Sequence, residues 1–395
     1  MTYQDNCTLP TELLEQIAEQ GLDAIPEMMR TLINAAMHME RQAYLGASPY
    51  ERTLERRDHA NGFKPKTVAT RMGQVTFDVP QVRHGSFYPQ SLEKGLRSER
   101  ALKLALAEMY IQGVSTRKVT AITEKLCGFE VSSAQVSQAT ALLDEQLQAW
   151  RERPLGQCRY LYLDARYEKV RQDGQVRDAA VLIAVGVNET GKREVLGISV
   201  ALSEQEVHWR TFMQSLVARG LRGLELIVSD AHAGLKQARK AVFGSIPWQR
   251  CQFHLQQNAQ GYVPRQNMKQ EVAADIRAIF NAANRDEAEA LLAKTVQKYA
   301  KTASRLASWM EENLPEGFTV FAFPTQQQRL LRTTNGLERL NREIRRRSRV
   351  AAIFPNEASC LRLATAIVME ISEDWVTGRT YMRFDEIGCK GSVLS

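Results

Sequence analysis

Hydrophobic residues recur at helical spacing in the first part of the chain. From 13 to 47 they return every three or four residues, which predicts an amphipathic helical stretch. A polar, basic connector follows from Ser48 to Lys66, and the alternation of Gln74 to Arg83 predicts a short strand. Helical spacing returns from Ser98 to Gln112. We therefore expect residues 1–95 to form a helical and basic N-terminal region.

Two short helices around a glycine are predicted inside residues 96–150. Gly128 ends the first helix, and Ser132 or Ser133 can cap the second. The pattern is typical of a helix-turn-helix, whose second helix, here Ser133 to Asp144, lies in a DNA major groove. An ordinary helical hairpin used only for packing explains the same pattern.

The middle of the chain changes to strand patterns interrupted by helices. In chain order we expect strands at 159–165, 179–189 and 193–201, a helix at 203–219, a strand at 224–230, a helix at 231–243 and a strand at 248–254. The turn signal from Asn188 to Gly191 joins the second and third strands as an antiparallel hairpin. Three antiparallel strands, a helix and a parallel strand follow one another in this order in the ribonuclease H-like fold. The sequence thus predicts an α/β protein with a mixed sheet over 151–257.

The rest of the chain is predicted to be mostly helical. Helical spacing runs from Leu255 to Glu312, and the segment from Phe318 to Pro324 interrupts it. We expect residues 258–325 to form an all-helical region. A further helix with a strongly basic end lies within 326–356 and carries Glu338. Residues 357–395 are expected to form a C-terminal helical tail.

Two carboxylates end apolar strands of the predicted sheet. Because the first and fourth strands of this topology lie side by side, Asp164 and Asp230 would come together. Carboxylates a few ångströms apart repel each other and are tolerated when a divalent cation neutralises them. Oxygen ligands suit Mg²⁺ or Mn²⁺, and two such ions can activate a nucleophile and stabilise a leaving oxygen in phosphoryl transfer.

Glu338 is the candidate for a third acidic ligand, since two aspartates are few for two ions. At about 100° per residue it shares one helix face with Arg342 and Arg345. An adjacent apolar stripe can pack on the sheet while this face looks toward a bound phosphate.

Two of the three carboxylates could instead serve only to cap helices. Asp230 could cap a helix that begins near Ala231, and Glu338 could reach back to Asn335 in a capping box. Asp164 is harder to explain in this way, because no turn signal comes directly after it. The pattern alone leaves both interpretations open.

Charge and cysteine usage indicate the kind of partner and the compartment. The formal net charge of +7 favours a polyanion such as nucleic acid. The six cysteines are scattered and do not resemble a disulfide framework, which favours a reduced, cytoplasmic protein. No secretory signal opens the chain, and no run reaches the roughly 18 apolar residues that cross a bilayer. We expect no membrane association.

Several segments together resemble the Mutator-type insertion-sequence transposases of bacteria. They are 71–89, 110–119, 160–165, 219–238, 248–258 and 333–356. The resemblance implies a DDE transposase whose ribonuclease H-like core is interrupted by the all-helical region as an insertion. By position, Asp164, Asp230 and Glu338 would be the catalytic, metal-binding carboxylates, holding two Mg²⁺ or Mn²⁺ ions. The implied reaction is cleavage at the terminal inverted repeats followed by strand transfer.

The same resemblance implies where DNA binds. The helix-turn-helix becomes a reader of the element's ends. The basic end of the later helix becomes a clamp for DNA phosphates, made of Arg345, Arg346, Arg347 and Arg349. A solvated basic face explains the same arginines. The candidate DNA-binding residues are Arg117, Lys118, Ser133, Gln135, Ser137, Gln138, Arg342, Arg345 and Arg346. The implied partners are the double-stranded DNA of the inverted repeats and of the target. We also expect a homodimer, because two ends must be processed together.

Cys251 and His254 match the family's Cys-x-x-His signature. This spacing could supply half of a zinc site, but a structural zinc site needs four ligands and no second pair is visible. Residues three apart on a strand also point to opposite faces, which disfavours joint ligation unless a turn intervenes. We therefore expect a structural role for both.

Two other functions fit parts of the pattern. A structure-specific nuclease on the same core would hydrolyse DNA without joining it to a target. A helix-turn-helix regulator without chemistry would tolerate loss of the acidic residues.

Overall fold

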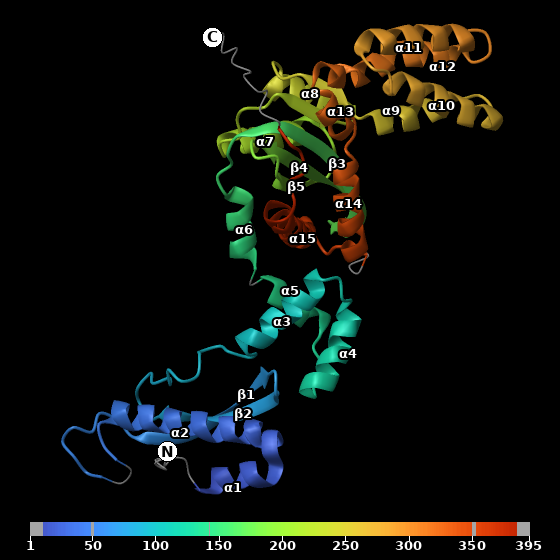
Figure 1. The fold of residues 1–395 in the computed structure, drawn as a ribbon. Helices are drawn as coiled ribbons and strands as arrows, with labels where there is room; N and C mark the ends of the chain where they lie inside the picture. Colours follow the sequence, from blue (N-terminus) through green and yellow to red (C-terminus); the bar gives the residue numbers. More distant parts are fainter. Residues whose placement is uncertain (1–10, 49–50, 142, 350–352, 385–395) are drawn as a thin grey trace, which may run out of the picture. The chain divides into compact units, whose positions relative to one another are not determined.

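The computed structural model describes residues 11–48, 51–141, 143–349 and 353–384, with the side chains of 11–13 and 137 left aside. It divides into two compact units, Met1–Leu143 and Asp144–Ser395. Within the described residues, no helix is both long and apolar enough to span a membrane. Figure 1 shows the elements of both units.

The first unit begins with helices and a β-hairpin. Helix α1 (Thr11–Gln20) and a 3-10 turn η1 (Gly21–Ala24) lead into α2 (Ile25–Leu45), which packs on strands β1 (Ala60–Thr70) and β2 (Gly73–Val82). The predicted connector is therefore wrong in its second half, because β1 begins inside it. The first residues of β1 are exposed and show no alternation, so pairing with β2 rather than burial makes them a strand.

Three helices complete the first unit around one small apolar core. They are α3 (Arg100–Ile111), α4 (Thr116–Cys127) and α5 (Ser133–Ala141). Ser132 is the cap that the sequence predicts: its hydroxyl accepts the Gln135 N–H at 3.2 Å, and the Gln135 side chain accepts the Ser132 N–H at 2.8 Å. Helix α5 ends at Ala141, earlier than predicted, and α6 (Asp144–Glu152) begins the second unit.

A five-stranded mixed sheet forms the centre of the second unit. Its strands are β3 (Cys158–Gln172), β4 (Gln175–Asn188), β5 (Arg193–Ala201), β6 (Leu226–Ser229) and β7 (Trp248–Arg250). They lie in the order β5-β4-β3-β6-β7, with β3 to β5 antiparallel and with β6 and β7 parallel to β3. The predicted adjacency of the first and fourth strands is confirmed, since β3 pairs with β6.

Two strand boundaries differ from the prediction. Strand β3 continues past Asp164 to Gln172, and Asp173 and Gly174, both with positive φ, turn it into β4. This Asp-Gly pair is a strong hairpin signal that the sequence interpretation missed. Strand β7 ends at Arg250, where Cys251 caps α9 (Gln252–Ala259), so the predicted strand at 248–254 is a strand followed by a helix.

Helices cover both faces of the sheet. On one face, α7 (Glu206–Ala218) and α8 (Ala233–Phe243) bury a core that includes Leu161, Leu163 and Trp209. On the other face lie α13 (Thr325–Leu331), α14 (Asn335–Ser348) and α15 (Glu357–Thr377) (Figure 1). The alternation of β3 makes this possible, because Tyr160 and Tyr162 point away from the Leu161 core and hydrogen-bond to Gln327 and to the carbonyl of Leu330 in α13.

The chain between β7 and α13 is helical, as predicted. After α9 it forms α10 (Lys269–Phe280), α11 (Arg285–Tyr299) and α12 (Ser304–Asn313), joined by 3-10 turns η2 (Gln260–Tyr262) and η3 (Gln266–Met268) and followed by η4 (Leu314–Gly317) and η5 (Thr319–Ala322). These helices have an apolar core of their own. The buried Gln249 of β7 attaches them to the sheet: its amide donates to the Gly317 carbonyl at 2.9 Å and accepts from the Val320 N–H at 2.7 Å.

The β4–β5 turn offers a test of this packing. Gly191 and Gly174 both have φ of +76°, but a Cβ on Gly191 would lie 1.7 Å from the Met382 carbonyl oxygen, whereas a Cβ on Gly174 meets nothing within 4 Å. We expect Gly191→Ala to lower the free energy of unfolding by about 2–4 kcal/mol, and Gly174→Ala by about 1 kcal/mol from backbone strain alone. Chemical denaturation measures both. Equal losses would contradict the packing of 380–382 on this turn.

Candidate active site

Strand β3 presents Asp164 on the face that α14 covers. The residue lies in the middle of the strand, between the buried Leu163 and the half-buried Ala165. One carboxylate oxygen accepts the Ala165 N–H at 3.0 Å, and the other accepts the Asn341 amide of α14 at 2.8 Å. These two hydrogen bonds together fix the orientation of the Asp164 carboxylate.

Asp230 follows the last residue of β6, the strand that pairs in parallel with β3. Its carboxylate accepts the N–H of Ala231 at 2.6 Å. The suggested capping role is wrong, because α8 begins at Ala233 and its N-cap is His232. Asp230 is therefore available for another role.

The two aspartates influence each other electrostatically. Burial raises the pKa of Asp164 to about 6, and the charge of Asp230 acts in the same direction. The nearby His254 and the hydrogen bonds from Ala165 and Asn341 oppose the rise. A cation bound beside Asp164 would offset the free-energy cost of ionising its carboxylate.

Glu338 lies in the first turn of α14 and lines the same cavity as Asp164. The cavity measures about 760 Å³ and is lined by Asp164, Ala165, Arg166, Tyr167, Glu168, Lys169, Asp178, His254, Glu338, Asn341, Arg342, Arg345, Ser348 and Arg349. The capping-box alternative is wrong, since the N-cap of α14 is Thr334 rather than Asn335 and its N–H donates to the Cys251 sulfur. Within the described residues, the Glu338 carboxylate has no hydrogen bond or ion pair.

Polar contacts fasten α14 along β3. Arg166 donates to the Asn341 carbonyl, and the Ser348 hydroxyl donates to Glu168 at 3.0 Å. After the helix, Phe354 bonds through its backbone to Lys169 and Arg171 of the same strand. The position of Glu338 relative to Asp164 is therefore set by contacts over the length of the helix.

The three carboxylates are near one another without forming a closed ligand set. Asp164 and Glu338 line one cavity, and Asp230 acts on Asp164 from the next strand. Among the residues that the structure describes, no three His, Cys, Asp or Glu side chains come close enough together to hold a metal ion. The role of the triad therefore remains a prediction.

Cys251 and His254 lie on one side of a helix start. Because the chain turns into α9 at Cys251, the two side chains meet rather than pointing apart, and the thiol also accepts hydrogen bonds from the backbone and hydroxyl of Thr334. Hydrogen bonding to the Cys251 sulfur raises the pKa of His254 to about 9 against the effect of burial, and Asp230 and Asp164 raise it further. His254 thus joins the carboxylates in the cavity, a position that spacing alone did not reveal.

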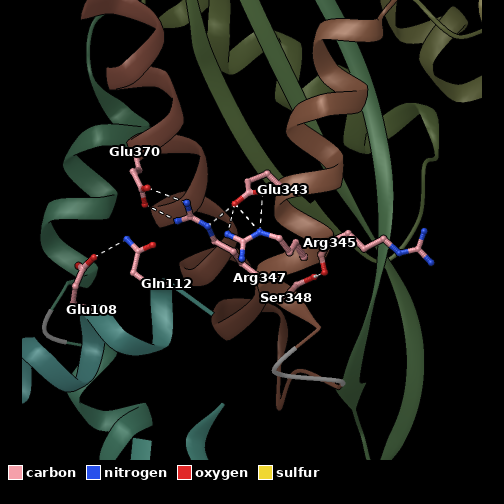
Figure 2. A network of polar contacts seen from close by, with 8 residues as sticks. Glu108, Gln112, Glu343, Arg345, Arg347, Ser348 and Glu370 are labelled. Atoms are coloured by element: carbon pink, nitrogen blue, oxygen red, sulfur yellow. Dashed lines mark hydrogen bonds and ion pairs between the residues drawn. The ribbon is translucent and has the colours of Figure 1, made fainter. Parts of the chain in front are cut away.

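The arginines of α14 divide between two faces. Arg342, Arg345 and Arg349 are exposed and line the cavity beside Glu338. Arg346 instead donates to Glu343, and the buried Arg347 bridges Glu343 and Glu370 of α15. In Figure 2, Arg345 extends away from this network. Of the predicted phosphate contacts, the structure thus brings Arg342, Arg345 and Arg349 to the cavity. Arg346 does not line it, and the prediction is wrong for Arg347, which is buried and paired with two carboxylates.

The other predicted DNA-binding residues lie on α4 and α5 of the first unit. Arg117, Lys118, Ser133 and Gln138 are exposed. Gln135 is exposed as well, but its side-chain oxygen is engaged by Ser132. The side chain of Ser137 lies outside the described residues.

Comparison with known proteins identifies the family. The model of the family "Transposase, Mutator family" matches residues 2–378 of this chain. The chain belongs to the Mutator family of transposases. Among its relatives, the transposase for insertion sequence element IS406 of Burkholderia multivorans is 59% identical over 371 residues, which cover 93% of this chain and 96% of that protein.

More distant relatives extend over the same length. The transposase for ISRM5 of Rhizobium meliloti is 44% identical and covers 92% of each chain. The transposase for IS256 in transposon Tn4001 of Staphylococcus aureus is 35% identical over 97% of this transposase and 100% of its own length. A chain from the structure of simian T-cell lymphotropic virus intasome with PP2A regulatory subunit B56 gamma aligns over 50% of this chain and 66% of its own at 13% identity and a TM-score of 0.18, which is too low to support a conclusion.

Asn341 and Arg166 belong to the site but were not predicted from the sequence. A signal for Asn341 exists, since it follows Glu338 by three residues and so lies on the same side of the helix. Arg166 follows Asp164 by two residues on one face of a strand. The Arg166 signal could not be used before the strand was known to continue past Asp164. The Asn341 signal did not identify its partner, which lies 177 positions away.

The Cys251–His254 contact predicts an unusual titration. In the metal-free transposase, we expect the His254 imidazole to titrate near pH 9, and Cys251→Ala to move the midpoint down toward the ordinary value of about 6.5. Because the folded pKa is raised, the contribution of His254 to stability is complete below about pH 6.5 and is lost as the pH rises through about 9. NMR titration measures the midpoint, with Cys158→Ala as the control. An unchanged midpoint in Cys251→Ala would contradict the contact as the cause.

Proposed function

We propose that this chain is a DDE transposase that binds the terminal inverted repeats of an insertion sequence, cuts DNA there and joins the ends to a target. The observation that carries the proposal is that Asp164 and Glu338, far apart in sequence, line one cavity, while Asp230 acts on Asp164 from the neighbouring strand. Membership of the Mutator family supports transposition as the biological process. The strand order β5-β4-β3-β6-β7 supports a ribonuclease H-like core.

The residues of the cavity suit a hard divalent cation. The donors are carboxylate oxygens, and the side-chain oxygen of Asn341 is buried there with no hydrogen-bond partner among the described residues. Asp164 and Glu338 of this cavity, with Asp230 of the next strand, would hold Mg²⁺ or Mn²⁺ after a closer approach than the described residues show. Two such ions serve phosphoryl transfer. When bound, the ions would neutralise the carboxylates and polarise the scissile phosphodiester.

The chain's own groups perform the remaining tasks. Asn341 and the Ala165 N–H orient the Asp164 carboxylate, so that little reorganisation is needed on binding. Arg342, Arg345 and Arg349 present cations at the cavity, where DNA phosphates would bind. His254, held protonated by Cys251, adds a further positive charge beside the acidic residues.

End recognition is proposed for the first unit. The exposed residues of α4 and α5, with a capped second helix, are compatible with a helix-turn-helix in a major groove. Because two ends must be processed together, we propose that two copies of the chain act as a dimer. A structure-specific nuclease on the same core remains the alternative, and joining activity separates the two.

The carboxylates give a direct test. We expect Asp164→Asn, Asp230→Asn and Glu338→Gln each to abolish cleavage and strand transfer with Mg²⁺ while end binding persists, because metal binding needs the charge and DNA docking does not. The exposed Glu312→Gln is the control. A reaction of end-bearing DNA with a target, followed by gel electrophoresis, measures cutting and joining. Full activity in one of the three variants would remove that residue from the triad.

The proposed reader helix gives a second test. We expect Gln138→Glu to weaken binding to the terminal repeat by roughly tenfold, the value of about one base contact, with a smaller effect on random DNA. Gln297→Glu, an exposed position on α11, is the matched control. Binding titrations on both DNAs measure the ratio. Equal losses on the two DNAs would exclude α5 as the sequence reader.

A further inference from the structure

A second charged cavity lies on the other side of α14 from the carboxylates. It measures about 580 Å³ and lies between α14, α15 and the start of β5. Its lining is Arg193, Arg339, Leu340, Arg342, Glu343, Arg347, Glu370, Ile371, Asp374, Trp375, Arg379 and Tyr381. Arg342 lines both cavities, so the two adjoin at this residue.

The charges of this cavity do not balance. Figure 2 shows that Arg347 engages Glu343 and Glu370. Arg346 also forms an ion pair with Glu343. The remaining charged lining residues are four arginines, Arg193, Arg339, Arg342 and Arg379, against one carboxylate, Asp374. In the part of the chain that the structure describes, none of these four arginines has an ion pair.

Among these four arginines, Arg193 has the surroundings that most favour an anionic ligand. Its guanidinium lies between two aromatic rings, 4.2 Å from the Trp375 centroid and 4.0 Å from the Tyr381 centroid. Its Nε is buried and has no hydrogen-bond partner in the part of the chain that the structure describes. Among the described residues, the Arg193 guanidinium faces two aromatic rings and forms no ion pair. This half-buried cation therefore loses hydration without gaining a counter-charge, which favours an anionic ligand.

We propose that this cavity binds a backbone phosphate of the DNA strand next to the cleavage site. The proposal rests on the proposed function, since the adjoining carboxylate cavity would hold the scissile phosphodiester. A strand that passes Arg342 would place a neighbouring phosphate against Arg193, Arg339 and Arg379. Arginine forks suit phosphate oxygens, and the aromatic rings hold the Arg193 fork in place.

The test measures binding of the full chain to DNA in EDTA, so that it does not depend on metal or on the catalytic carboxylates. Arg339 and Arg379 are exposed, so we expect Arg339→Gln/Arg379→Gln to fold normally. The affinity for an end duplex that keeps its flanking DNA should fall by roughly tenfold. The slope of log affinity against log salt should fall by about 0.9, the value for the one phosphate that the variant no longer neutralises. Lys301→Gln/Arg305→Gln, an exposed pair beside and within α12, removes the same charge as a control.

A second duplex, cut at the element's end and lacking the flank, locates the phosphate. A loss of affinity only with flanked DNA would assign the phosphate to the flanking strand, and a loss with both would assign it to the element's own end. No loss, or an equal loss in the control pair, would overturn the proposal. This experiment measures binding and not cleavage. A negative result would therefore not contradict the proposed catalytic triad, and inactive triad variants would not produce the same loss of binding.

Discussion

The alternation of side chains along β3 is the constraint on which the second unit depends. Leu161 and Leu163 face the core beneath α7 and α8, while Tyr160, Tyr162 and Asp164 face the C-terminal helices. A single strand therefore both anchors the hydrophobic core and receives the helix that carries Glu338. A shift of one residue in its register would exchange the two sets, burying the carboxylate among apolar side chains and exposing leucines.

The basic helix α14 serves two purposes that its sequence does not separate. Its apolar stripe and its Glu343–Arg347–Glu370 network fix it against the sheet and α15, whereas Arg342, Arg345 and Arg349 stay exposed at the cavity. Arg347 is buried whereas both glutamates are partly exposed, so the network costs desolvation of the arginine and holds α14 in position against α15. Charged residues of one type thus divide into those that hold the helix and those that are available to an anion.

Much of this arrangement could be predicted from the sequence, and the failures have physical causes. The strand order and the Asp164–Asp230 adjacency follow from periodicity and topology, because buried strands of an α/β core have clear patterns. The first residues of β1 were not predicted as a strand because they are exposed and are paired by backbone hydrogen bonds alone. The Cys251–His254 contact was not predicted because it depends on where β7 ends, and hydrophobicity marks strand ends poorly. The contact of Asn341 with Asp164 was not predicted because the two residues lie 177 positions apart in the sequence.

The attachment of α14 has a consequence for changes in chain length. Glu338 and Asn341 are spaced by less than one helical turn, and Asn341 is tied to β3. One residue inserted between them would turn Glu338 by about 100° around the helix axis, away from Asp164. The region between β7 and α13, by contrast, has its own core and joins the sheet through Gln249, so extra residues in its outer turns would leave the acidic side chains where they are. Length is therefore free to vary in that region and not within α14.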